Sequence, residues 1–304
     1  MNIPDDRESS GSEAAVSTGY YPSLHWSVEH GWTAVSECVA AEAPLAIEIG
    51  YERSGQLVNR VLGVTMRTPG DDAALATGFL LSEGLIDRIE DITDSSGSDR
   101  NSLGESISTW RIGLARAPQT DLRRVKRESV TNSACGLCGR KTLAGLPLLP
   151  PRSATVQAMV QSCEGVLAMP DALRQFQATF AETGGVHGAA LFDGLGRTLL
   201  VREDVGRHNA VDKLVGRALL NEISPAGKVL VLSGRVSFEL MQKAAAAGVA
   251  MVVAVGAPSS LAVDLAHFAG ITLVGFVRSG RFNVYTHADR LSAQGHTGTR
   301  LDLI

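Results

Sequence analysis

Two cysteines separated by two residues, Cys135 and Cys138, form a Cys-x-x-Cys pair that could carry out chemistry. They lie in the segment Ser-Ala-Cys-Gly-Leu-Cys-Gly-Arg at 133–140, where glycine and alanine have no bulk that could bury either sulfur. The pattern therefore predicts an exposed loop. A Cys-x-x-Cys on such a loop can be half of a zinc site, a disulfide, a redox couple or a nucleophile that carries sulfur.

The remaining cysteines do not decide between these chemistries. Cys38 and Cys163 stand alone in the sequence, so a closed site with four zinc ligands has little support. A thioredoxin-like pair would lie at the start of a helix in a βαβ unit, and the flanking residues do not show that pattern. From chemistry alone, a sulfur or thiol nucleophile ranks first, a redox pair second and zinc third, and all three stay open.

Composition restricts the class of protein. The 304 residues carry a net charge of -4 with a pI near 6.0, which argues against general binding of nucleic acid. The sequence has no apolar run near the roughly 20 residues that cross a bilayer, so no membrane span is predicted. The N-terminal residues are acidic and polar, without the apolar core of a signal peptide. Together with only four cysteines, this predicts a cytoplasmic protein with reduced thiols.

Composition and patterning also divide the chain into four parts. The first part is rich in Ser, Glu, Asp and Gly and is expected to be a disordered tail, because it has too little apolar surface to fold. The predicted parts are the tail at 1–22, a small mixed α+β domain at 23–128, the Cys-x-x-Cys loop and a proline-containing linker at 129–152, and an α/β domain at 153–304.

The N-terminal domain shows a hairpin pattern followed by a helix pattern. Alternating residues predict paired strands over 45–49 and 57–66, and the next apolar run predicts a helix over 73–82. Asp71 and Asp72 are expected to cap that helix. Two short strands are expected around Glu90 and over 107–114, flanking a loop rich in Ser, Gly and Asp.

The C-terminal domain has a clearer pattern. After a helix predicted over 171–180, the runs 187–192 and 197–201 form a hairpin, and a helix with apolar residues from Val211 to Leu219 follows. Three nearly continuous apolar runs, 229–232, 249–255 and 271–277, then alternate with helices at 238–247 and 261–269. This alternation predicts parallel strands that are buried on both faces, in a three-layer α/β sandwich.

The residues after these strands suit an anionic ligand. Ligands of parallel sheets bind beyond the carboxyl ends of the strands, beside helix N-termini. Here those ends read Ser233–Arg235, Gly256–Ser260 and Arg278–Phe282, with small residues and arginines that suit phosphate. Each loop alone has the composition of an ordinary turn, but their coincidence at one edge favours a ligand such as a nucleotide diphosphate. The sequence has no glycine-rich Rossmann or Walker motif.

Two histidines accompany these loops. His208 and Asn209 follow Asp204, a candidate helix cap, in the polar segment 203–213. That segment is either a solvated first turn of a helix or a ligand contact. His187 follows a Thr-Gly-Gly-Val turn, where a single histidine is more often structural than catalytic.

The chain resembles a known family, the formate dehydrogenase accessory sulfurtransferases of the FdhD type, from about Pro44 to Leu291. Six motifs in the order of the family carry the resemblance: Ser133–Gly139, Thr183–His187, Glu203–Lys213, Ser233–Glu239, Gly256–Ser260 and Arg281–Thr286. Several long motifs in one order make chance agreement very improbable.

The resemblance implies a sulfurtransferase. It implies that sulfur is taken from a cysteine desulfurase and passed to the bis-molybdopterin guanine dinucleotide cofactor that formate dehydrogenase needs. Cys135 would hold the persulfide, and Cys138 would assist transfer or resolve a mixed species. The last strand end matches the cofactor-binding segment of the family, and neighbouring loops would hold the guanine nucleotide ends. The implied binding residues are Phe276, Val277, Arg278, Ser279, Gly280 and Arg281, with Ser233, Arg235, Gly256, Ser259, His187 and His208 from the neighbouring loops.

The resemblance further implies a homodimer without zinc and a second domain similar to the cytidine deaminase fold. Zinc deaminases carry two thiols at the strand end that here reads Ser233-Gly234-Arg235, so zinc-dependent deamination is disfavoured. A different class remains in competition: a chaperone that shelters the molybdenum cofactor and uses its thiols only for zinc or redox sensing. Replacement of Cys135 by Ala distinguishes the two, because a pure chaperone would still give active formate dehydrogenase.

Overall fold

The computed structural model describes residues 17–119, 122 and 160–292. Cys135, Cys138 and the loop and linker predicted at 129–152 lie outside these residues. The tail predicted at 1–22 lies outside them up to residue 16, and the first strand, β1, begins at Thr18. Among the described residues, none of the helices combines the length and apolar character needed to span a membrane.

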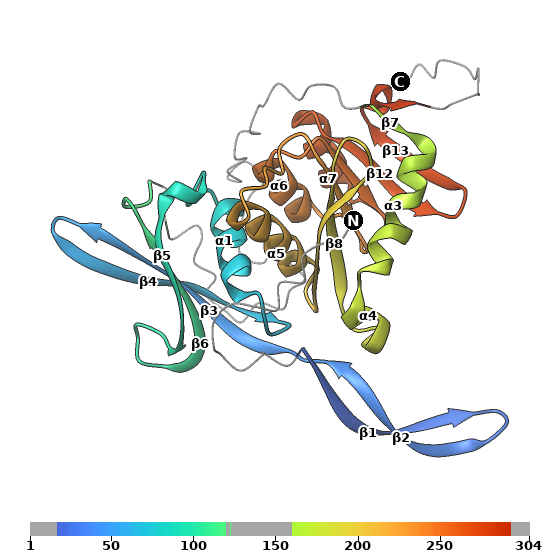
Figure 1. Ribbon diagram of the computed structural model, residues 1–304, viewed down its shortest axis with the longest axis horizontal. Coiled ribbons are helices and arrows are strands. Elements are labelled where there is room, and N and C mark those ends of the chain that lie inside the picture. The colour runs from blue at the N-terminus through green and yellow to red at the C-terminus, as the bar shows by residue number, and fades with distance from the viewer. Residues whose placement is uncertain (1–16, 120–121, 123–159, 293–304) are drawn as a thin grey trace.

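A six-stranded mixed sheet forms the centre of the C-terminal part (Figure 1). Its strand order is β13-β12-β11-β10-β8-β9, and β10, β11 and β12 are parallel, as predicted. Strands β8, β9 and β13 pair antiparallel with their neighbours, and β9 and β13 form the two edges. The bounds are β8 His187–Phe192, β9 Thr198–Asp204, β10 Val229–Leu232, β11 Met251–Ala254, β12 Thr272–Arg278 and β13 Arg281–Thr286.

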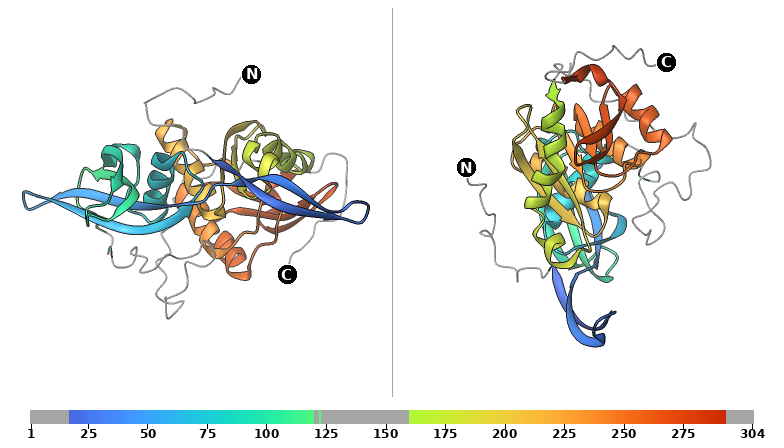
Figure 2. Two further views of the ribbon diagram at one scale, coloured as in Figure 1. Left: turned by 90° about the horizontal axis from the view of Figure 1, so that it is seen from below. Right: turned by 90° about the vertical axis from the view of Figure 1, so that its right-hand side faces the viewer.

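Helices cover both faces of this sheet, which confirms the three-layer arrangement (Figures 1 and 2). Val229 and Val231 pack with α3 (Cys163–Gln175) on one face. Leu230 and Leu232 face the other way, toward the layer of α5, α6 and α7. These helices span Arg207–Leu220, Phe238–Ala247 and Ser260–Phe268. The likeness to the cytidine deaminase fold stays a prediction.

The helix predicted over 171–180 is wrong at both ends. Helix α3 begins at Cys163, where the Ser162 hydroxyl accepts a hydrogen bond from the Gly165 N–H at 2.9 Å. It continues through Pro170, a residue that usually marks a helix boundary. It ends at Gln175, and a second short helix, α4, follows at Ala178–Thr183.

The N-terminal part contains a four-stranded sheet of order β4-β3-β6-β5, in which the predicted hairpin is β3 with β4. The strand expected around Glu90 is wrong, because residues 89–91 form a 3-10 turn. The Ser/Gly/Asp-rich segment expected as a loop is instead strand β5, which pairs with β6. The bounds are β3 Ala43–Arg53, β4 Gln56–Arg67, β5 Ile92–Arg100 and β6 Ser106–Leu114, with a small sheet of β7 Gln161–Ser162 and β14 Leu291–Ser292.

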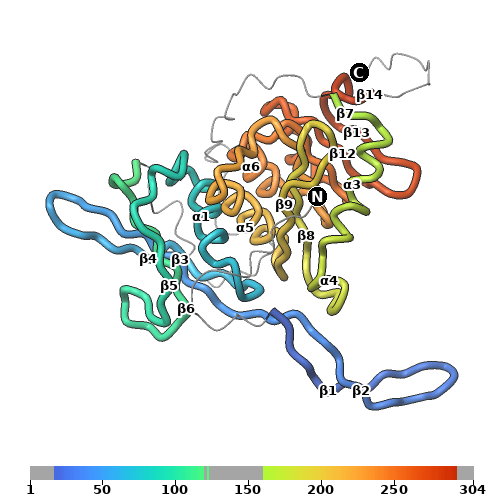
Figure 3. The backbone as a smooth tube through the Cα atoms, viewed as in Figure 1, coloured from blue at the N-terminus to red at the C-terminus, as the bar shows by residue number. Residues whose placement is uncertain are grey.

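A two-stranded ribbon precedes β3 in the chain. Strands β1 (Thr18–Ser27) and β2 (Gly31–Ala40) pair over their full length. The ribbon projects away from the rest of the protein, as the smooth trace in Figure 3 shows most simply. At its base, β2 contacts α4 and leads directly into β3.

Helix α1 (Asp72–Ser82) connects the N-terminal sheet to the C-terminal helices. Every residue from Ala74 to Ser82 is buried. Two glycines allow α1 and α5 to touch backbone to backbone: a Cβ at Gly78 would lie 1.9 Å from the Asp212 carbonyl oxygen, and one at Gly216 would lie 1.9 Å from that of Ala74. The close approach of the two helices therefore depends on the absence of side chains at both positions.

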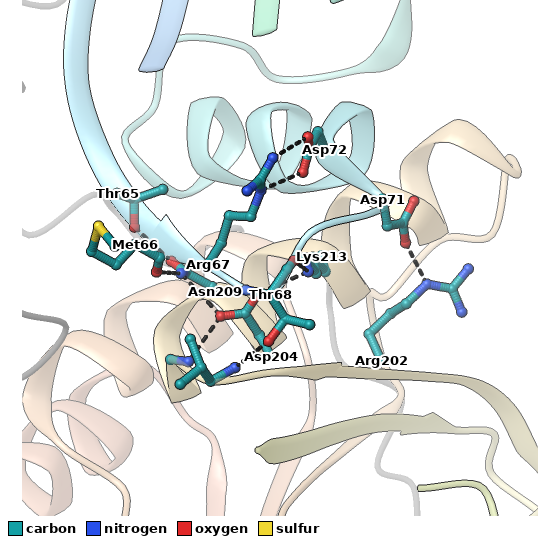
Figure 4. A network of polar contacts seen from close by, with 12 residues as sticks. Thr65, Met66, Arg67, Thr68, Asp71, Asp72, Arg202, Asp204, Asn209 and Lys213 are labelled. Atoms are coloured by element: carbon teal, nitrogen blue, oxygen red, sulfur yellow. Dashed lines mark hydrogen bonds and ion pairs between the residues drawn. The ribbon is translucent and has the colours of Figure 1, made fainter. Parts of the chain in front are cut away.

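A buried ion pair fixes the same junction (Figure 4). Asp204, at the end of β9, accepts a charge-assisted hydrogen bond from the Lys213 ammonium at 2.7 Å, and both side chains are almost fully inaccessible. The carboxylate also accepts from the backbone N–H groups of Gly206 at 2.8 Å and Thr68 at 3.1 Å. Lys213 donates in addition to the Thr68 carbonyl at 2.7 Å. The end of β4 is thus held against the start of α5.

Asn209 extends this network. Its side-chain amide donates to the Met66 carbonyl at 2.7 Å and to Asp204 at 3.1 Å, and its oxygen accepts from the Thr65 hydroxyl at 3.2 Å. A solvated first turn is therefore wrong for this segment, because Asp204, Asn209 and Lys213 are all buried between the two parts of the chain.

Further ion pairs join the same elements. Asp212 on α5 accepts from Lys243 on α6 at 2.8 Å and from the Ser82 hydroxyl at 2.9 Å. Asp71 was expected to cap α1, but it makes no side-chain cap and adopts a left-handed backbone conformation with φ 57. Its carboxylate instead pairs with Arg202 at 2.5 Å and with Arg217.

We expect Gly216→Ala to destabilise the protein by at least about 1–3 kcal/mol, because the new methyl group would overlap the α1 backbone. Chemical denaturation measures the free energy of unfolding. Gly165→Ala, in the first turn of α3, is the matched control, since its new Cβ would meet only the side chains of Ser162 and Gln161 within 4 Å. An equal loss for both variants would contradict the proposed packing constraint.

We expect Lys213→Met to cost about 3–5 kcal/mol, because it leaves the Asp204 carboxylate buried without its counter-ion. The control is Arg197→Ala, which breaks the pair of Asp193 with an arginine that is 66% exposed. Exposed pairs contribute roughly 0–1 kcal/mol. The free energy of unfolding is measured by denaturation at neutral pH. Similar decreases in the two variants would show that the buried pair stabilises the protein no more than an exposed one.

Candidate functional site

One edge of the six-stranded sheet gathers most of the residues that the sequence predicts to bind a ligand. The parallel strands β10, β11 and β12 end there, and the antiparallel strand β8 begins there. Backbone hydrogen bonds connect the three loops that follow the parallel strands. Gly256 donates to the Gly234 carbonyl at 3.2 Å, and Phe276 donates to the Gly256 carbonyl at 3.1 Å. The predicted clustering at one edge is therefore confirmed.

Three helices begin beside this edge, since α5, α6 and α7 follow β9, β10 and β11 in the chain. Ser237 caps α6 and Ser259 caps α7, each through its side-chain oxygen. The first N–H groups of a helix have no partners within the helix and carry a partial positive charge. An edge with three such termini is a favourable environment for an anion.

Positively charged side chains around His187 add to the positive potential of the helix N-termini. Burial lowers the pKa of His187, and the nearby Arg207, His208 and Arg235 lower it further, while Asp204 opposes the effect. His187 is therefore neutral at neutral pH in the free protein. An anion bound at this edge would favour the protonated form and raise this pKa.

Arg207 is a further candidate residue of this site, one that is absent from the residues predicted to bind. It is the first residue of α5, it acts electrostatically on His187, and its Nε is buried without a hydrogen-bond partner among the described residues. A buried guanidinium N–H with no acceptor is unusual, so this group is a candidate donor to a ligand. Its position beside the predicted start of the helix could have identified Arg207 as a candidate from the sequence.

His208 is buried, with 8% of its surface exposed. Its Nε2 is 3.2 Å from the Glu239 carboxylate and 3.4 Å from the Ser237 hydroxyl, so it joins α5 to the start of α6. It also lines a small pocket between β3, β4, α1, α5 and α6. Thr65, Phe79, Asp212 and Lys243 also line that pocket.

Several predicted ligand residues have structural duties that account for their type. Ser233 accepts from the Gly188 N–H at 2.9 Å through its hydroxyl, which extends the pairing of β10 with β8. Gly256 has no room for a side chain, because a Cβ would lie 2.8 Å from the Arg235 backbone. Ser259 uses its hydroxyl to cap α7. Arg235, in contrast, is exposed.

The segment 276–281 continues from β12 into the turn before β13. An irregularity between Gly275 and Arg278 gives Phe276 a left-handed φ of 54 and leaves its side chain 38% exposed. The turn residues 278–281 are all exposed. Val277 is the exception, because its side chain is 2% exposed and packs in the core with α3. Its side chain therefore serves the core, and its predicted role in ligand binding stays a prediction.

Within the described ranges, no group of three or more His, Cys, Asp or Glu side chains is arranged to hold a metal ion. The two cysteines in those ranges, Cys38 and Cys163, are unpaired thiols. Burial raises the pKa of Cys163, and the charge of Glu164 raises it further, so this thiol is a poor nucleophile at neutral pH. The predicted catalytic residues Cys135 and Cys138 lie outside the described part of the chain.

Comparison with known proteins places this chain among proteins of one kind. The model of the FdhD/NarQ family matches residues 40–292. A sulfur carrier protein FdhD from Thermoplasma acidophilum is 43% identical over 281 residues, which cover 92% of this chain and 96% of the relative. A protein of the same name from Mycobacterium tuberculosis is 44% identical over 265 residues, covering 84% of this chain and 92% of the relative.

A solved structure agrees with the fold. The crystal structure of a protein from Desulfotalea psychrophila, described as a formate dehydrogenase accessory protein, superposes with a TM-score of 0.66. It is 24% identical and covers 90% of this chain and 99% of its own. Because the family model spans most of the sequence and the relatives align almost from end to end, the chain belongs to the FdhD/NarQ family.

Proposed function

We propose that this protein accepts sulfur from a cysteine desulfurase as a persulfide on Cys135. It then delivers that sulfur, in the cytoplasm, to the bis-molybdopterin guanine dinucleotide cofactor that formate dehydrogenase requires. The observation that carries the proposal is the family match over residues 40–292, a range that includes the Cys-x-x-Cys segment. Its curated relatives are named sulfur carrier proteins.

The two thiols suffice for a balanced transfer. The Cys135 thiolate attacks the outer sulfur of the donor persulfide, the sulfur–sulfur bond of the donor breaks, and the donor cysteine leaves as a thiolate. The Cys138 thiolate then attacks Sγ of Cys135. The bond to the outer sulfur breaks, and that sulfur leaves as hydrosulfide, reduced by two electrons. The product is a Cys135–Cys138 disulfide, which a cellular thiol reduces before the next cycle.

The edge of the C-terminal sheet is the proposed binding site for the cofactor, which is the substrate here. Its guanine nucleotide ends carry diphosphates, and the edge offers three helix N-termini together with Arg207 and Arg235. The exposed turn with Arg278 and Arg281 lies beyond β12 and supplies further positive charge. Neutral His187 can donate or accept a hydrogen bond there, and a bound anion would favour its protonated form.

We expect a purified cysteine desulfurase with cysteine to add the mass of one sulfur atom to the peptide that contains Cys135. Peptide mass spectrometry under non-reducing conditions measures the addition. Cys135→Ser should lose it, and Cys138→Ser should retain it, because the second thiol acts after loading. Cys163→Ser is the control for the poorly nucleophilic thiol. Sulfur found on Cys38 or Cys163 while Cys135 stays unmodified would contradict the proposal.

The same variants separate a sulfur carrier from a cofactor chaperone. A cell that lacks its own copy of this protein should recover formate dehydrogenase activity with the natural chain but not with Cys135→Ser. Recovery with that variant would support the chaperone class instead.

We expect Arg235→Ala to weaken guanosine diphosphate binding by about 10- to 100-fold, the loss typical of a charged hydrogen bond. Isothermal titration calorimetry measures the affinity. Arg197→Ala is the matched control, since Arg197 lies in the β8–β9 turn, at the opposite end of the sheet. Unchanged affinity in Arg235→Ala, or an equal loss in both variants, would exclude Arg235 from the binding site.

A further inference from the structure

His187 stands directly opposite a buried carboxylate. It begins β8, and its partner across the strand pair is Asp204 on β9. Directly opposed residues of an antiparallel pair share a face of the sheet, with Cβ atoms about 4.5–5.5 Å apart. Asp204 is 0% exposed and is held by the Lys213 ammonium at 2.7 Å, as Figure 4 shows. A fixed negative charge therefore lies on the same face as the imidazole.

Positive groups surround the same imidazole. Gly234, in the loop after β10, leaves room for the ring, because a Cβ there would lie only 3.3 Å from Nδ1 of His187. Arg235 follows Gly234 in the chain, and Arg207 and His208 begin α5. These three residues act electrostatically on His187. An anion that is bound by the arginines of this edge would therefore lie close to the imidazole.

The neighbouring acidic side chains have other partners. Glu203 lies on the other face of the strand pair and accepts hydrogen bonds from two backbone N–H groups at the start of α4, both at 2.9 Å. The Glu239 carboxylate lies 3.2 Å from Nε2 of His208. In the described part of the chain, Asp204 thus remains as the carboxylate that opposes the cations around His187.

We propose that the ligand of this edge binds together with one proton, which His187 takes from solvent and holds between the anion and Asp204, an inference that rests on the anion site proposed above. In the free protein, burial and the nearby Arg207, His208 and Arg235 lower the pKa of His187. A bound diphosphate offsets those charges and adds a second negative charge to that of Asp204, so it favours the imidazolium. Release of the ligand returns the proton to solvent.

This coupling makes the affinity for the ligand depend on pH. Because the pKa of His187 is higher with the ligand than without it, binding is tightest below the pKa of the free protein. It weakens as the pH rises through the pKa of the complex. An opposite charge at contact distance changes such an equilibrium by about 10-fold or more. A site that used only arginines would not show this dependence, since arginine stays charged throughout.

Isothermal titration calorimetry with diguanosine diphosphate tests the coupling. In this ligand both ends of the diphosphate are esterified, so it exchanges no proton near neutral pH, whereas a terminal phosphate titrates at about pH 6. Titrations in buffers of different ionisation enthalpy measure the protons taken up for each ligand bound. We expect uptake of up to one proton by the natural chain and none by His187→Gln, because glutamine can form hydrogen bonds but cannot be protonated.

His267→Gln is the matched control. His267 lies near the end of α7 that is remote from the Ser259 cap, and its ring stacks on that of His287. This variant should keep both the proton uptake and the dependence of affinity on pH. Circular dichroism checks that both variants remain folded. In the natural chain, imidazole NMR signals, assigned to His187 by their absence from His187→Gln, should show its pKa rising when the ligand binds.

Two results would overturn the coupling and leave the cofactor site in place. One is equal proton uptake by the natural chain and His187→Gln. The other is binding without uptake at every pH between about 5 and 8, the range in which histidine changes its charge. Absence of diguanosine diphosphate binding to the natural chain would overturn the cofactor site and the coupling together.

Discussion

The arrangement of this protein depends on one buried ion pair, Asp204 with Lys213. Two charges without access to water are costly unless each of their remaining hydrogen-bond positions is filled. Here the backbone of Thr68 and of Gly206, just before α5, fills them, so the pair is satisfied only when both parts of the chain are in place. Burial raises the pKa of the Asp204 carboxyl, and the Lys213 ammonium opposes that rise. Loss of either partner would leave the other charge buried at the junction without its counter-ion.

The close contact of α1 with α5 also holds the two parts of the chain together. Gly78 and Gly216 let the two backbones touch, and the Asp212–Lys243 pair continues the contact into α6. As a result, α5 is held by packing along its length and by ionic contacts at its first turns. The first residues of that helix, Arg207 and His208, belong to the candidate site, so the geometry of the site follows from the junction between the two parts of the chain.

The sequence was sufficient to predict the central sheet and the layers, because buried parallel strands produce continuous apolar runs with sharp ends. The helix over 238–247 and the strand over 229–232 have the predicted bounds. The predicted secondary structure was wrong where tertiary contacts override the local preferences of the residues. Strand β5 is polar and exposed, and its position comes from pairing with β6 rather than from its own residues. Helix α3 contains Pro170, and its start depends on the Ser162 cap.

The location of the candidate site was also predictable from the strand pattern, but the contacts of its residues were not. The three strand ends converge as expected, because parallel topology requires it. Buried partners could not be inferred, since nothing in the order of residues shows that Asn209 would contact the end of β4. Nor did the residue types distinguish Val277, which is buried, from its exposed neighbour Phe276. An irregular pairing of β12 with β13 decides that difference.

The motif at 203–213 combines positioning residues with residues that we propose to bind the ligand, and this affects how losses of function should be interpreted. Asp204 accepts from the Gly206 N–H and holds Lys213, so it fixes the position of the first turn of α5. Arg207 and His208 extend from that turn toward His187 and Glu239. A change at Asp204 would therefore displace both residues and weaken ligand binding without any contact between Asp204 and the ligand. Stability would fall together with affinity in that case, whereas a change at exposed Arg235 would lower affinity alone.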